Sequence, residues 1–546
     1  MSVQQQENGG FDDAADVVII GSGSAAATAA LTAAKKGASV LILEKSDKLG
    51  GTSAMSGAGT WVPANHHMLA AGLQDSPAET LTYLRATAPE GWAETEDELW
   101  QAFAENAPRM LEFVEANTPL EFALTHEADP MAEYPGGKTG GRTLSPKPLS
   151  RRILGKYAPK LRRSTLPHIF TYQELSHDIQ RRFVSTVVKM APTLIWRWLT
   201  DTRGQGNALM AGLLKGCLDT GCRIETKTRA VKLLTDEDDG GVIGVLVEQL
   251  GRQRRIRARR GVLLGTGGFE WNPEMFAKHF PGPLDFIGSP RTNEGDGQLM
   301  AQAIGAKLDH MDQANISYLV PTRYEGRLHG IPLEFHTVPN AILVNRLGQR
   351  FTSEYRFNMG EMLNQRDEHG QPVHLPVWLI TDADFFRNSG LLRWFARFDK
   401  RWVTKARTLE DLADRIRLPA AHLVQTVARF NELAGKGVDE DFHRGETPLE
   451  KERAAVSGLM APITKPPFVA IPFNRSILGT KGGARTNAAG QVLRPDGSII
   501  AGLYCAGIAM ASPIGTRAVG SGTTIGPNMT WGYICANAML QANRGG

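Results

Sequence analysis

The feature that most constrains the fold is a strand, turn and helix pattern near the start of the chain. A β-branched run at residues 16–20 leads into Gly-Ser-Gly-Ser-Ala-Ala at 21–26, and an alanine-rich stretch continues to residue 36. A second apolar run at 40–43 ends in Glu44. This order of segments is typical of a βαβ unit that binds a dinucleotide. We therefore expect an α/β chain that begins with a Rossmann-like domain.

Each position of this motif has a mechanical role in holding a pyrophosphate. Gly21 permits the tight turn that leaves the strand, Gly23 lets the backbone approach the phosphates, and Ala26 is small enough for close packing of the helix on the sheet. The first N–H groups of the helix have no partner within the helix, so they attract negative charge. Glu44, about twenty residues further along, can accept hydrogen bonds from the ribose hydroxyls.

Length and charge limit the classes of protein to consider. With 546 residues the chain is long for one hydrophobic core, so two domains are expected. The formal net charge is +4 and no long block carries one sign, so nucleic-acid binding is not predicted. None of the four cysteines lies in a Cys-x-x-Cys spacing, which argues against a disulfide scaffold, haem attachment or a metal site.

The sequence favours a cytoplasmic enzyme. Residues 1–13 are polar and acidic, unlike a secretory signal, and no apolar run is long enough to span a membrane. A basic segment at 151–163 could attract an anionic partner or make peripheral membrane contact, although a solvated loop is the simpler interpretation. Its cations are Arg151, Arg152, Lys156, Lys160, Arg162 and Arg163.

Small-residue loops at both ends of the chain indicate the cofactor and the domain plan. Residues 49–59 form a long loop of the kind that wraps a phosphate and a ribityl chain, which simple nicotinamide dehydrogenases do not need. A glycine-rich segment at 520–527 precedes a helical stretch near the C-terminus. A site built from both ends implies an inserted block. We therefore expect an FAD-binding domain in two parts, 1–308 and 466–546, and an inserted α+β catalytic cap domain at 309–465.

Seven short motifs, taken together, resemble one flavoprotein group. They occur in the order found in the fumarate reductase and 3-ketosteroid dehydrogenase flavoprotein superfamily, and the likeness spans nearly the whole chain. Tyr-Pro-Gly-Gly at 134–137, Val-Asn-Arg at 344–346 and Gly-Val-Asp-Glu-Asp-Phe at 437–442 are most similar to the ketosteroid Δ1-dehydrogenase branch. The seven motifs are GSGSAA, GGTSAMSG, GVLLGTGGF, TNEGDG, ILGTKGGARTN, GLYCAG and GSGTTIGP.

The resemblance implies a noncovalently bound FAD. Ser53 stands where related respiratory enzymes carry a histidine that is linked to the flavin. In the family pattern the first glycines hold the pyrophosphate, Glu44 the ribose and the loop at 51–57 the ribityl chain, and the later motifs close the site. Carried over to this sequence, the FAD-binding residues are Gly21, Gly23, Ser24, Ala25, Glu44, Lys45, Gly51, Thr52, Ser53, Gly57, Thr266, Gly267, Gly268, Asp296, Gly507, Gly522 and Ile525.

The catalytic residues of the ketosteroid branch are mostly replaced. That branch uses three tyrosines, and the matching places here hold Pro130 or Met131, then Asn358, then Ala518. Gly522, whose backbone N–H meets the substrate carbonyl in the family, is retained. The resemblance therefore does not carry over the usual steroid machinery, and it favours a substrate other than the usual Δ1 steroid.

Desaturation beside a ketone needs a donor for the enolate oxygen, a base for the α-proton, and flavin N5 to take hydride from the β-carbon. The turn at Gly522, just before a helix, can supply the donor. The candidate base is Tyr172, which follows a loop that lies over the active site in this branch, with Tyr134 and Tyr355 as displaced alternatives. Each tyrosine could instead be a buried residue with a satisfied hydroxyl. Asn358 either orients the substrate carbonyl or caps a helix.

Two histidines and three tryptophans are weaker candidates. His168 and His336 could titrate near neutrality, yet ordinary loop or core positions are the simpler interpretation. Trp61, Trp196 and Trp198 suit the wall of an apolar substrate site, although their spacing is also that of ordinary core residues.

Together these features predict an FAD-dependent dehydrogenase that introduces a C=C bond α,β to the carbonyl of a cyclic apolar ketone, either a 3-ketosteroid or a smaller alicyclic ketone. One alternative is a flavin-dependent ene-reductase of an unsaturated acid or ketone. The arginine pairs that recognise a dicarboxylate are replaced, however, by Asn358 and Val519. A second alternative is a flavin-binding protein that has lost catalysis. The expected partners are the ketone and an electron acceptor, and the sequence identifies neither that acceptor nor the oligomeric state.

Overall fold

The structure is a computed structural model that describes residues 10–175 and 180–542. Most of the polar N-terminal segment, on which the absence of a secretory signal was judged, therefore lies outside the described residues. The chain divides into two compact units. The first unit contains 1–275, 289–313 and 479–546, and the second contains 276–288 and 314–478.

The second unit has different bounds from the inserted block expected at 309–465. β12 (Leu284–Ile287) pairs in parallel with β21 (Arg475–Thr480), and β14 (Ala314–Ser317) pairs with the other edge of β21. Segments before and after the expected block are therefore held in one sheet by backbone hydrogen bonds. The roles given to the two domains, FAD binding and catalysis, stay predictions.

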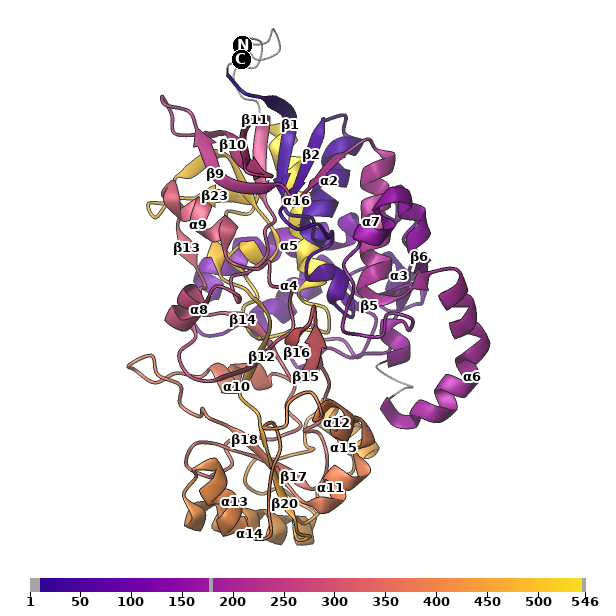
Figure 1. The fold of residues 1–546 in the computed structure, drawn as a ribbon, viewed down its shortest axis with the longest axis vertical. Coiled ribbons are helices and arrows are strands. Elements are labelled where there is room, and N and C mark those ends of the chain that lie inside the picture. The colour runs from indigo at the N-terminus through magenta and orange to yellow at the C-terminus, as the bar shows by residue number, and fades with distance from the viewer. Residues whose placement is uncertain (1–9, 176–179, 543–546) are drawn as a thin grey trace. The chain divides into compact units, whose positions relative to one another are not determined.

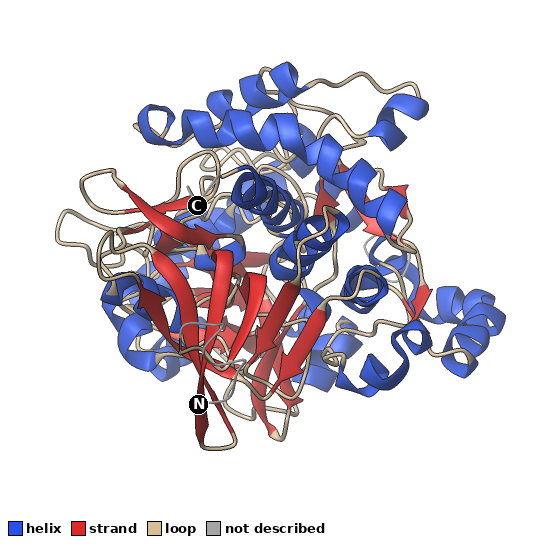
Figure 2. Ribbon diagram, turned by 90° about the horizontal axis from the view of Figure 1, so that it is seen from above, coloured by secondary structure: helices blue, strands red, loops and turns tan. Residues whose placement is uncertain are grey.

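A largely parallel sheet forms the centre of the first unit (Figures 1 and 2). β1 (Asp13–Ile20) pairs in parallel with β2 (Val40–Glu44) on one side and with β11 (Arg252–Leu264) on the other. Residues 17–20 and the whole of β2 are buried, as expected of parallel strands that helices cover on both faces. The strand order is β23 (Gln491–Leu493), β24 (Ile499–Cys505), β11, β1, β2, β8 (Arg223–Thr226). β10 (Val242–Gln249) joins β11 to β9 (Arg229–Thr235).

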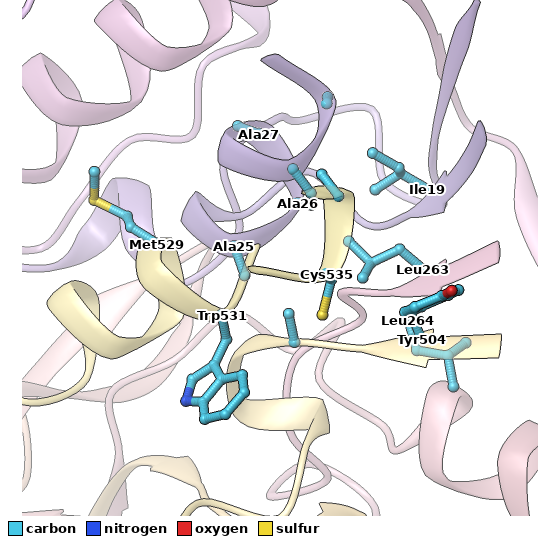
Figure 3. Close-up of a cluster of buried hydrophobic side chains, with 14 of the residues drawn as sticks. Ile19, Ala25, Ala26, Ala27, Leu263, Leu264, Tyr504, Met529, Trp531 and Cys535 are labelled. Carbon is cyan, nitrogen blue, oxygen red and sulfur yellow. The ribbon is translucent and has the colours of Figure 1, made fainter. Parts of the chain in front are cut away.

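Small side chains let two helices pack closely beside this sheet. α2 (Ser24–Lys35) is rich in alanine, and a Cβ placed at Gly532 of α16 (Ile525–Gln541) would lie 2.2 Å from the carbonyl oxygen of Ala25. Figure 3 shows Ala25 and Ala26 near Leu263 of β11 and Cys535 of α16. The N-terminal helix and the C-terminal helix therefore meet at the start of α2, where the dinucleotide motif lies.

The remaining elements of the first unit surround this centre. No helix among the described residues has both the length and the apolar character needed to cross a membrane. The elements are η1 (Ser53–Met55), β3 (Thr60–Trp61), α3 (His66–Ala70), α4 (Pro77–Ala86), α5 (Ala93–Asn117), β4 (Phe122–Leu124), β5 (Thr143–Pro146), β6 (Leu149–Ser150), η2 (Arg151–Lys160), α6 (Gln180–Leu199), β7 (Thr202–Arg203), α7 (Gln205–Asp219), β8 (Arg223–Thr226), β9 (Arg229–Thr235), β10 (Val242–Gln249), α9 (Asp296–Ala303), β13 (Leu308–Asp309), β22 (Gly483–Ala484), β23 (Gln491–Leu493), β24 (Ile499–Cys505) and η4 (Gly507–Ala509), with α8 (Pro273–His279) at the boundary.

The second unit is built on an antiparallel sheet with the order β17, β18, β20, β19. Its apolar core includes Ile342 and Ile380 from the strands and Leu412 and Phe430 from helices α13 and α14. The elements are β15 (Leu319–Tyr324), β16 (Arg327–Pro332), β17 (Ala341–Val344), α10 (Met359–Asn364), β18 (Trp378–Thr381), α11 (Ala383–Asn388), α12 (Gly390–Phe395), β19 (Thr404–Ala406), α13 (Leu409–Ile416), α14 (Ala420–Lys436), α15 (Pro448–Ser457) and β20 (Phe468–Pro472), besides β12, β14 and β21.

Candidate active site and cofactor site

The turn after β1 has room for a pyrophosphate. Gly21 has φ +106°, and a Cβ there would lie 2.1 Å from the carbonyl oxygen of Gly265, so only glycine fits. At Gly23 the nearest atom to an added Cβ is Ser53 Oγ, at 3.6 Å, and at Gly51 it is the Cα of Gly23, at 4.0 Å. Gly23 and Gly51 thus border an open space lined by backbone. These residues fit the phosphate group that the sequence predicts.

The loop after β2 is fixed to the N-terminus of α2. Ser53 Oγ accepts a hydrogen bond from the N–H of Ser24 at 3.1 Å and donates to Ser24 Oγ at 3.0 Å. Thr52 Oγ1 accepts from Asn293 Nδ2 at 3.0 Å. The structure therefore brings three predicted FAD-binding residues of this loop and helix together.

Glu44 ends β2 as a buried carboxylate, and burial raises its pKa. Its oxygens accept hydrogen bonds from Ser22 Oγ at 2.5 Å and from the N–H of Ser46 at 2.9 Å, which orients the carboxylate. Next to it, Lys45 Nζ lies 2.7 Å from an Asp296 oxygen. Two residues expected to bind FAD thus form an ion pair with each other, beside the predicted ribose site.

The turn after β11 contains a hydroxyl that a ligand could bind and a glycine that two side chains approach closely. Thr266 Oγ1 is buried and has no hydrogen-bond partner among the described residues, so a ligand oxygen could relieve its desolvation cost of about 1–3 kcal/mol. Gly267 has φ +84°. A Cβ on Gly268 would lie 2.3 Å from Glu270 Oε2 and from Thr480 Oγ1, so this glycine is packed against side chains.

The C-terminal motifs reach the start of α2. A Cβ on Gly507 would lie 3.1 Å from the Cβ of Ala25, and Ile525 begins α16 as a buried residue. Residues separated by almost the whole chain therefore meet around the first turn of one helix. The full set of FAD-binding residues stays a prediction, and the structure supplies a cradle that suits it.

Tyr172 and Gly522 both pack against the backbone segment at residues 57–59. The ring of Tyr172 packs against Gly57 and Gly59, where an added Cβ would lie 3.1 Å from its carbon atoms. Gly522 has φ +95°, and a Cβ there would lie 2.3 Å from the carbonyl oxygen of Gly59. Its own carbonyl accepts from the N–H of Trp61 at 3.3 Å. The first unit thus brings together the candidate base, the candidate oxyanion turn and the predicted flavin loop.

A residue that the sequence analysis did not select is bonded to the candidate base. The Tyr172 hydroxyl donates to Glu127, with both carboxylate oxygens 3.0 Å away. Glu127 is half-buried and lies in the loop between β4 and β5. The Tyr-Pro-Gly-Gly motif at 134–137 lies in the same loop but does not point to Glu127, so only the tertiary contact reveals the tyrosine–carboxylate pair.

The other two tyrosines have different surroundings. Tyr134 is 45% exposed, in a turn where its carbonyl accepts from the N–H of Gly137 at 2.9 Å. Tyr355 lies in the second unit, fully buried, and its hydroxyl donates to the carbonyl oxygen of Gly458 at 2.5 Å. Burial raises the pKa of Tyr355. Among residues 10–175 and 180–542, neither hydroxyl is hydrogen-bonded to a carboxylate that could take up its proton, unlike that of Tyr172.

Asn358 begins α10 in the second unit but its side chain does not cap the helix. It is buried, and its carbonyl accepts from the N–H of Glu361 at 3.2 Å. The capping alternative is therefore wrong, and a role in orienting a substrate stays a prediction. A relation of Asn358 or Tyr355 to the residues of the first unit is likewise a prediction.

The structure describes the surroundings of the two histidines and three tryptophans that were weaker candidates. Burial lowers the pKa of His168 to about 3 and that of His336 well below its usual value, so neither titrates near neutrality. Trp61 is buried in the core of the first unit. Trp196 and Trp198 are exposed, so their interpretation as core residues is wrong, and a place in the wall of a substrate site stays a prediction.

One group of described residues could offer ligands to a metal, where the sequence predicts none. Ligand atoms of His66, His67 and Glu115 lie within 4.8 Å of one another. Both histidine Nε2 atoms lie 2.9 Å from the same oxygen of Glu115. These contacts account for the cluster, and we assign no metal to it.

Comparison with known proteins then identifies the chain. The sequence matches the FAD binding domain family over residues 16–525. It belongs to this family. A 3-oxosteroid 1-dehydrogenase of Mycobacterium tuberculosis is 36% identical over 541 residues, which covers 92% of this chain and 94% of that protein. A 4-oxocyclohexanecarboxylate 2-dehydrogenase of Sinomonas cyclohexanicum is 34% identical over 526 residues, which covers 92% and 89%.

A solved structure agrees with these relatives. The crystal structure of 3-ketosteroid Δ1-dehydrogenase from Sterolibacterium denitrificans, in complex with 1,4-androstadiene-3,17-dione, matches with a TM-score of 0.84 at 32% identity. The match covers 97% of this chain and 100% of that chain. The predicted family, the α/β FAD-binding fold, the FAD cofactor and the oxidoreductase class are therefore confirmed.

Proposed function

We propose that the protein dehydrogenates a cyclic, largely apolar ketone next to its carbonyl group and forms an α,β-unsaturated ketone. The two relatives above are named as dehydrogenases of a 3-oxosteroid and of 4-oxocyclohexanecarboxylate, and both substrates are cyclic ketones. The observation that carries the proposal within this chain is the hydrogen bond between Tyr172 and Glu127, beside the predicted flavin loop.

The hydrogen bond gives Tyr172 a route to act as a base. A free tyrosine has a pKa of about 10 and is a weak base at neutral pH as a hydroxyl. When the substrate α-carbon gives its proton to Tyr172 Oη, the original hydroxyl proton can pass to the Glu127 carboxylate. The substrate C–H bond and the original Tyr172 O–H bond break, a new O–H bond forms on Tyr172 and another on Glu127, and the electron pair of the C–H bond moves toward the substrate carbonyl. Tyr172 therefore need not ionise before the reaction.

Gly522 and the start of α16 would stabilise that electron pair. Backbone N–H groups in a turn before a helix stabilise a developing oxyanion, with help from the helix dipole. The contact of Gly522 with Gly59 rules out a side chain at this position and fixes the turn. When bound, FAD supplies the acceptor for the hydride that leaves the β-carbon.

The replaced family tyrosines affect the choice of substrate. The matching positions, Pro130 or Met131, then Asn358 and Ala518, offer no phenol, so this chain depends on Tyr172 in a way that the family pattern does not. We propose that the substrate is either a smaller alicyclic ketone or a 3-ketosteroid. We also propose that FAD is bound noncovalently, because the hydroxyl of Ser53 is bonded to Ser24.

The test is anaerobic bleaching of the purified flavoprotein. The absorbance of the flavin band, at about 450 nm, is followed while three compounds are added in turn. These are an androstenedione-type steroid, a cyclohexanone and succinate. We expect rapid bleaching by at least one cyclic ketone and none by succinate. No bleaching by any ketone, with reoxidation of dithionite-reduced enzyme by an unsaturated acid, would contradict the proposal and favour a reductase.

A further inference from the structure

α6 turns apolar side chains toward solvent in the part whose side chains the structure describes, residues 187–199. Trp196 and Trp198 are 66% and 67% exposed, and Val188, Ile195 and Leu199 are 68%, 59% and 54% exposed. Figure 1 shows α6 at the margin of the first unit. Contiguous exposed apolar residues on a folded protein usually mark an interaction surface, whereas single ones do not.

The exposed residues form one broad face of the helix. At about 100° per residue, Val188, Ile195 and Leu199 lie within about 40° of one another. Trp196 and Trp198 flank this stripe on either side, each about 80° from its centre. The apolar face is thus about 160° wide, and we call these five residues the α6 face.

The orientation of the helix is fixed by a charged residue on its opposite side. Arg197 is buried, and its guanidinium donates to both oxygens of Glu174, at 2.8 and 3.0 Å, and to the carbonyl oxygen of Ile169 at 2.9 Å. A buried, paired charge is costly to expose. The usual amphipathic order is therefore reversed here, with an anchored cation inside and apolar residues outside.

Cations border the α6 face. The start of η2 is bonded to the end of α6, because Arg152 donates to the carbonyl oxygen of Leu199 at 2.7 Å. Arg152, Lys156 and Lys189 are exposed, while Arg151 is paired with Asp201 at 2.7 Å. Arg162, counted in the basic segment, is buried instead. The surface therefore combines tryptophans, aliphatic residues and a basic border.

We propose that the α6 face and the start of η2 dock the protein on a bilayer surface that contains anionic phospholipid. Amphipathic helices with tryptophan on the apolar side and basic residues beside it bind at the depth of the lipid headgroups. Indole rings favour this boundary because one edge is polar and the rest is apolar. This proposal stands on the surface alone and does not depend on the ketone activity.

Charge distinguishes a lipid surface from a second copy of the chain. In a two-fold dimer built on the α6 face, the same basic border of each copy would approach the other. An anionic bilayer offers the opposite charge, worth about 1 kcal/mol for each basic residue near the surface. The border of Arg152, Lys156 and Lys189 therefore favours lipid.

The test is flotation of the FAD-loaded full chain with vesicles. We expect binding to phosphatidylcholine vesicles with about 30 mol % phosphatidylglycerol and weaker binding at high salt. The variant Trp196→Ser/Trp198→Ser should lower binding by about tenfold or more. Trp394→Ser removes a similarly exposed tryptophan of the second unit, 54% exposed, and should leave binding unchanged. Quenching of tryptophan fluorescence by brominated lipid reports the insertion directly.

Three results would overturn the proposal. These are no flotation with the anionic vesicles, equal loss of binding in Trp394→Ser, and a concentration-dependent dimer in sedimentation that the double variant abolishes. Far-ultraviolet circular dichroism and bound FAD confirm that each variant is folded, because none of the three substituted side chains is buried.

Discussion

The two units place a tyrosine hydroxyl in opposite chemical settings. In the first unit Tyr172 donates to the carboxylate of Glu127. In the second unit Tyr355 donates to the carbonyl oxygen of Gly458, and the Arg444 guanidinium lies 4.0 Å from the centre of its ring. A carboxylate can take up a proton near neutral pH and a backbone carbonyl cannot. The tyrosine hydroxyl of the first unit can thus pass a proton to its partner, whereas the tyrosine of the second unit only packs in the core and bonds to the backbone.

Buried charge offers a second comparison between the two units. In the second unit Arg350 pairs with Glu354 at 2.9 Å and with Asp439 at 2.8 Å, and Arg444 lies 3.4 Å from Glu354. In the first unit the buried ammonium of Lys481 donates to the carbonyl oxygen of Gly515 at 2.7 Å. Burial lowers the pKa of Lys481 to about 8. The first unit also contains a buried network, in which Arg142 pairs with Asp75 and with Asp129, both at 2.8 Å, whereas Lys481 is held charged at a cost.

The largest expected effect comes from breaking the network of the second unit. Glu354→Gln leaves two buried guanidinium groups with one carboxylate fewer, so we expect the free energy of unfolding to fall by about 3–5 kcal/mol. Glu432→Gln, which removes an exposed partner of Lys436, should cost less than about 1 kcal/mol. Urea unfolding measures both. Equal losses in the two variants would contradict the account of the network.

The next effect is a pH dependence in the first unit. The pKa of Lys481 is about 8 in the folded state and about 10.5 unfolded, so the unfolded chain binds more protons between these values. Stability contributed by this group therefore rises with pH across that window, by about 3 kcal/mol in all. Lys481→Met should flatten the rise relative to the wild type. Parallel unfolding curves for the two proteins would contradict the lowered pKa.

A smaller effect is expected for the partner of the proposed base. Glu127→Gln keeps an acceptor for the Tyr172 hydroxyl but cannot take its proton at neutral pH. We expect kcat to fall by about 10- to 100-fold, a change of about 1.4–2.7 kcal/mol, with the unfolding midpoint unchanged. The pH profile of kcat should also lose its acidic limb. An unaltered profile would assign Glu127 a purely structural role.

The smallest effect concerns the buried tyrosine of the second unit. Tyr355→Phe removes the donor to the carbonyl of Gly458, an exposed residue that water can reach, and should cost about 1 kcal/mol of stability. We expect kcat of the folded variant to stay within about twofold of the wild type. A large loss of kcat with unchanged stability would instead give Tyr355 the catalytic role.

The sequence predicted the local features of the cofactor site. β1, the glycine turn, α2 and Glu44 follow one another in the chain, and their conformations depend on local sequence. Apolar runs and glycines were therefore enough to predict where each of them lies. The apolar periodicity of residues 408–433 is that of one helix. Arg417 has φ +60° and Pro419 lacks an N–H, so two helices form there instead of one.

Contacts between distant segments could not be predicted from periodicity. β5, β6 and η2 lie between Glu127 and Tyr172 in the chain, and nothing in the local sequence of either residue marks the other. The exposure of Trp196 and Trp198 depends on Arg197, whose partner Glu174 lies outside the helix. An alternation of aromatic and charged residues is compatible with either orientation, so tertiary pairing decides it.

The most direct test of the central claim is the reductive half-reaction of Tyr172→Phe under anaerobic conditions. With a ketone that bleaches the wild type, we expect bleaching to slow by about 10²- to 10⁴-fold. The ketone should still bind, seen as a shift of the flavin spectrum before reduction. Bleaching within about threefold of the wild-type rate would show that another group takes the α-proton, and would contradict the role that the structure suggests for Tyr172.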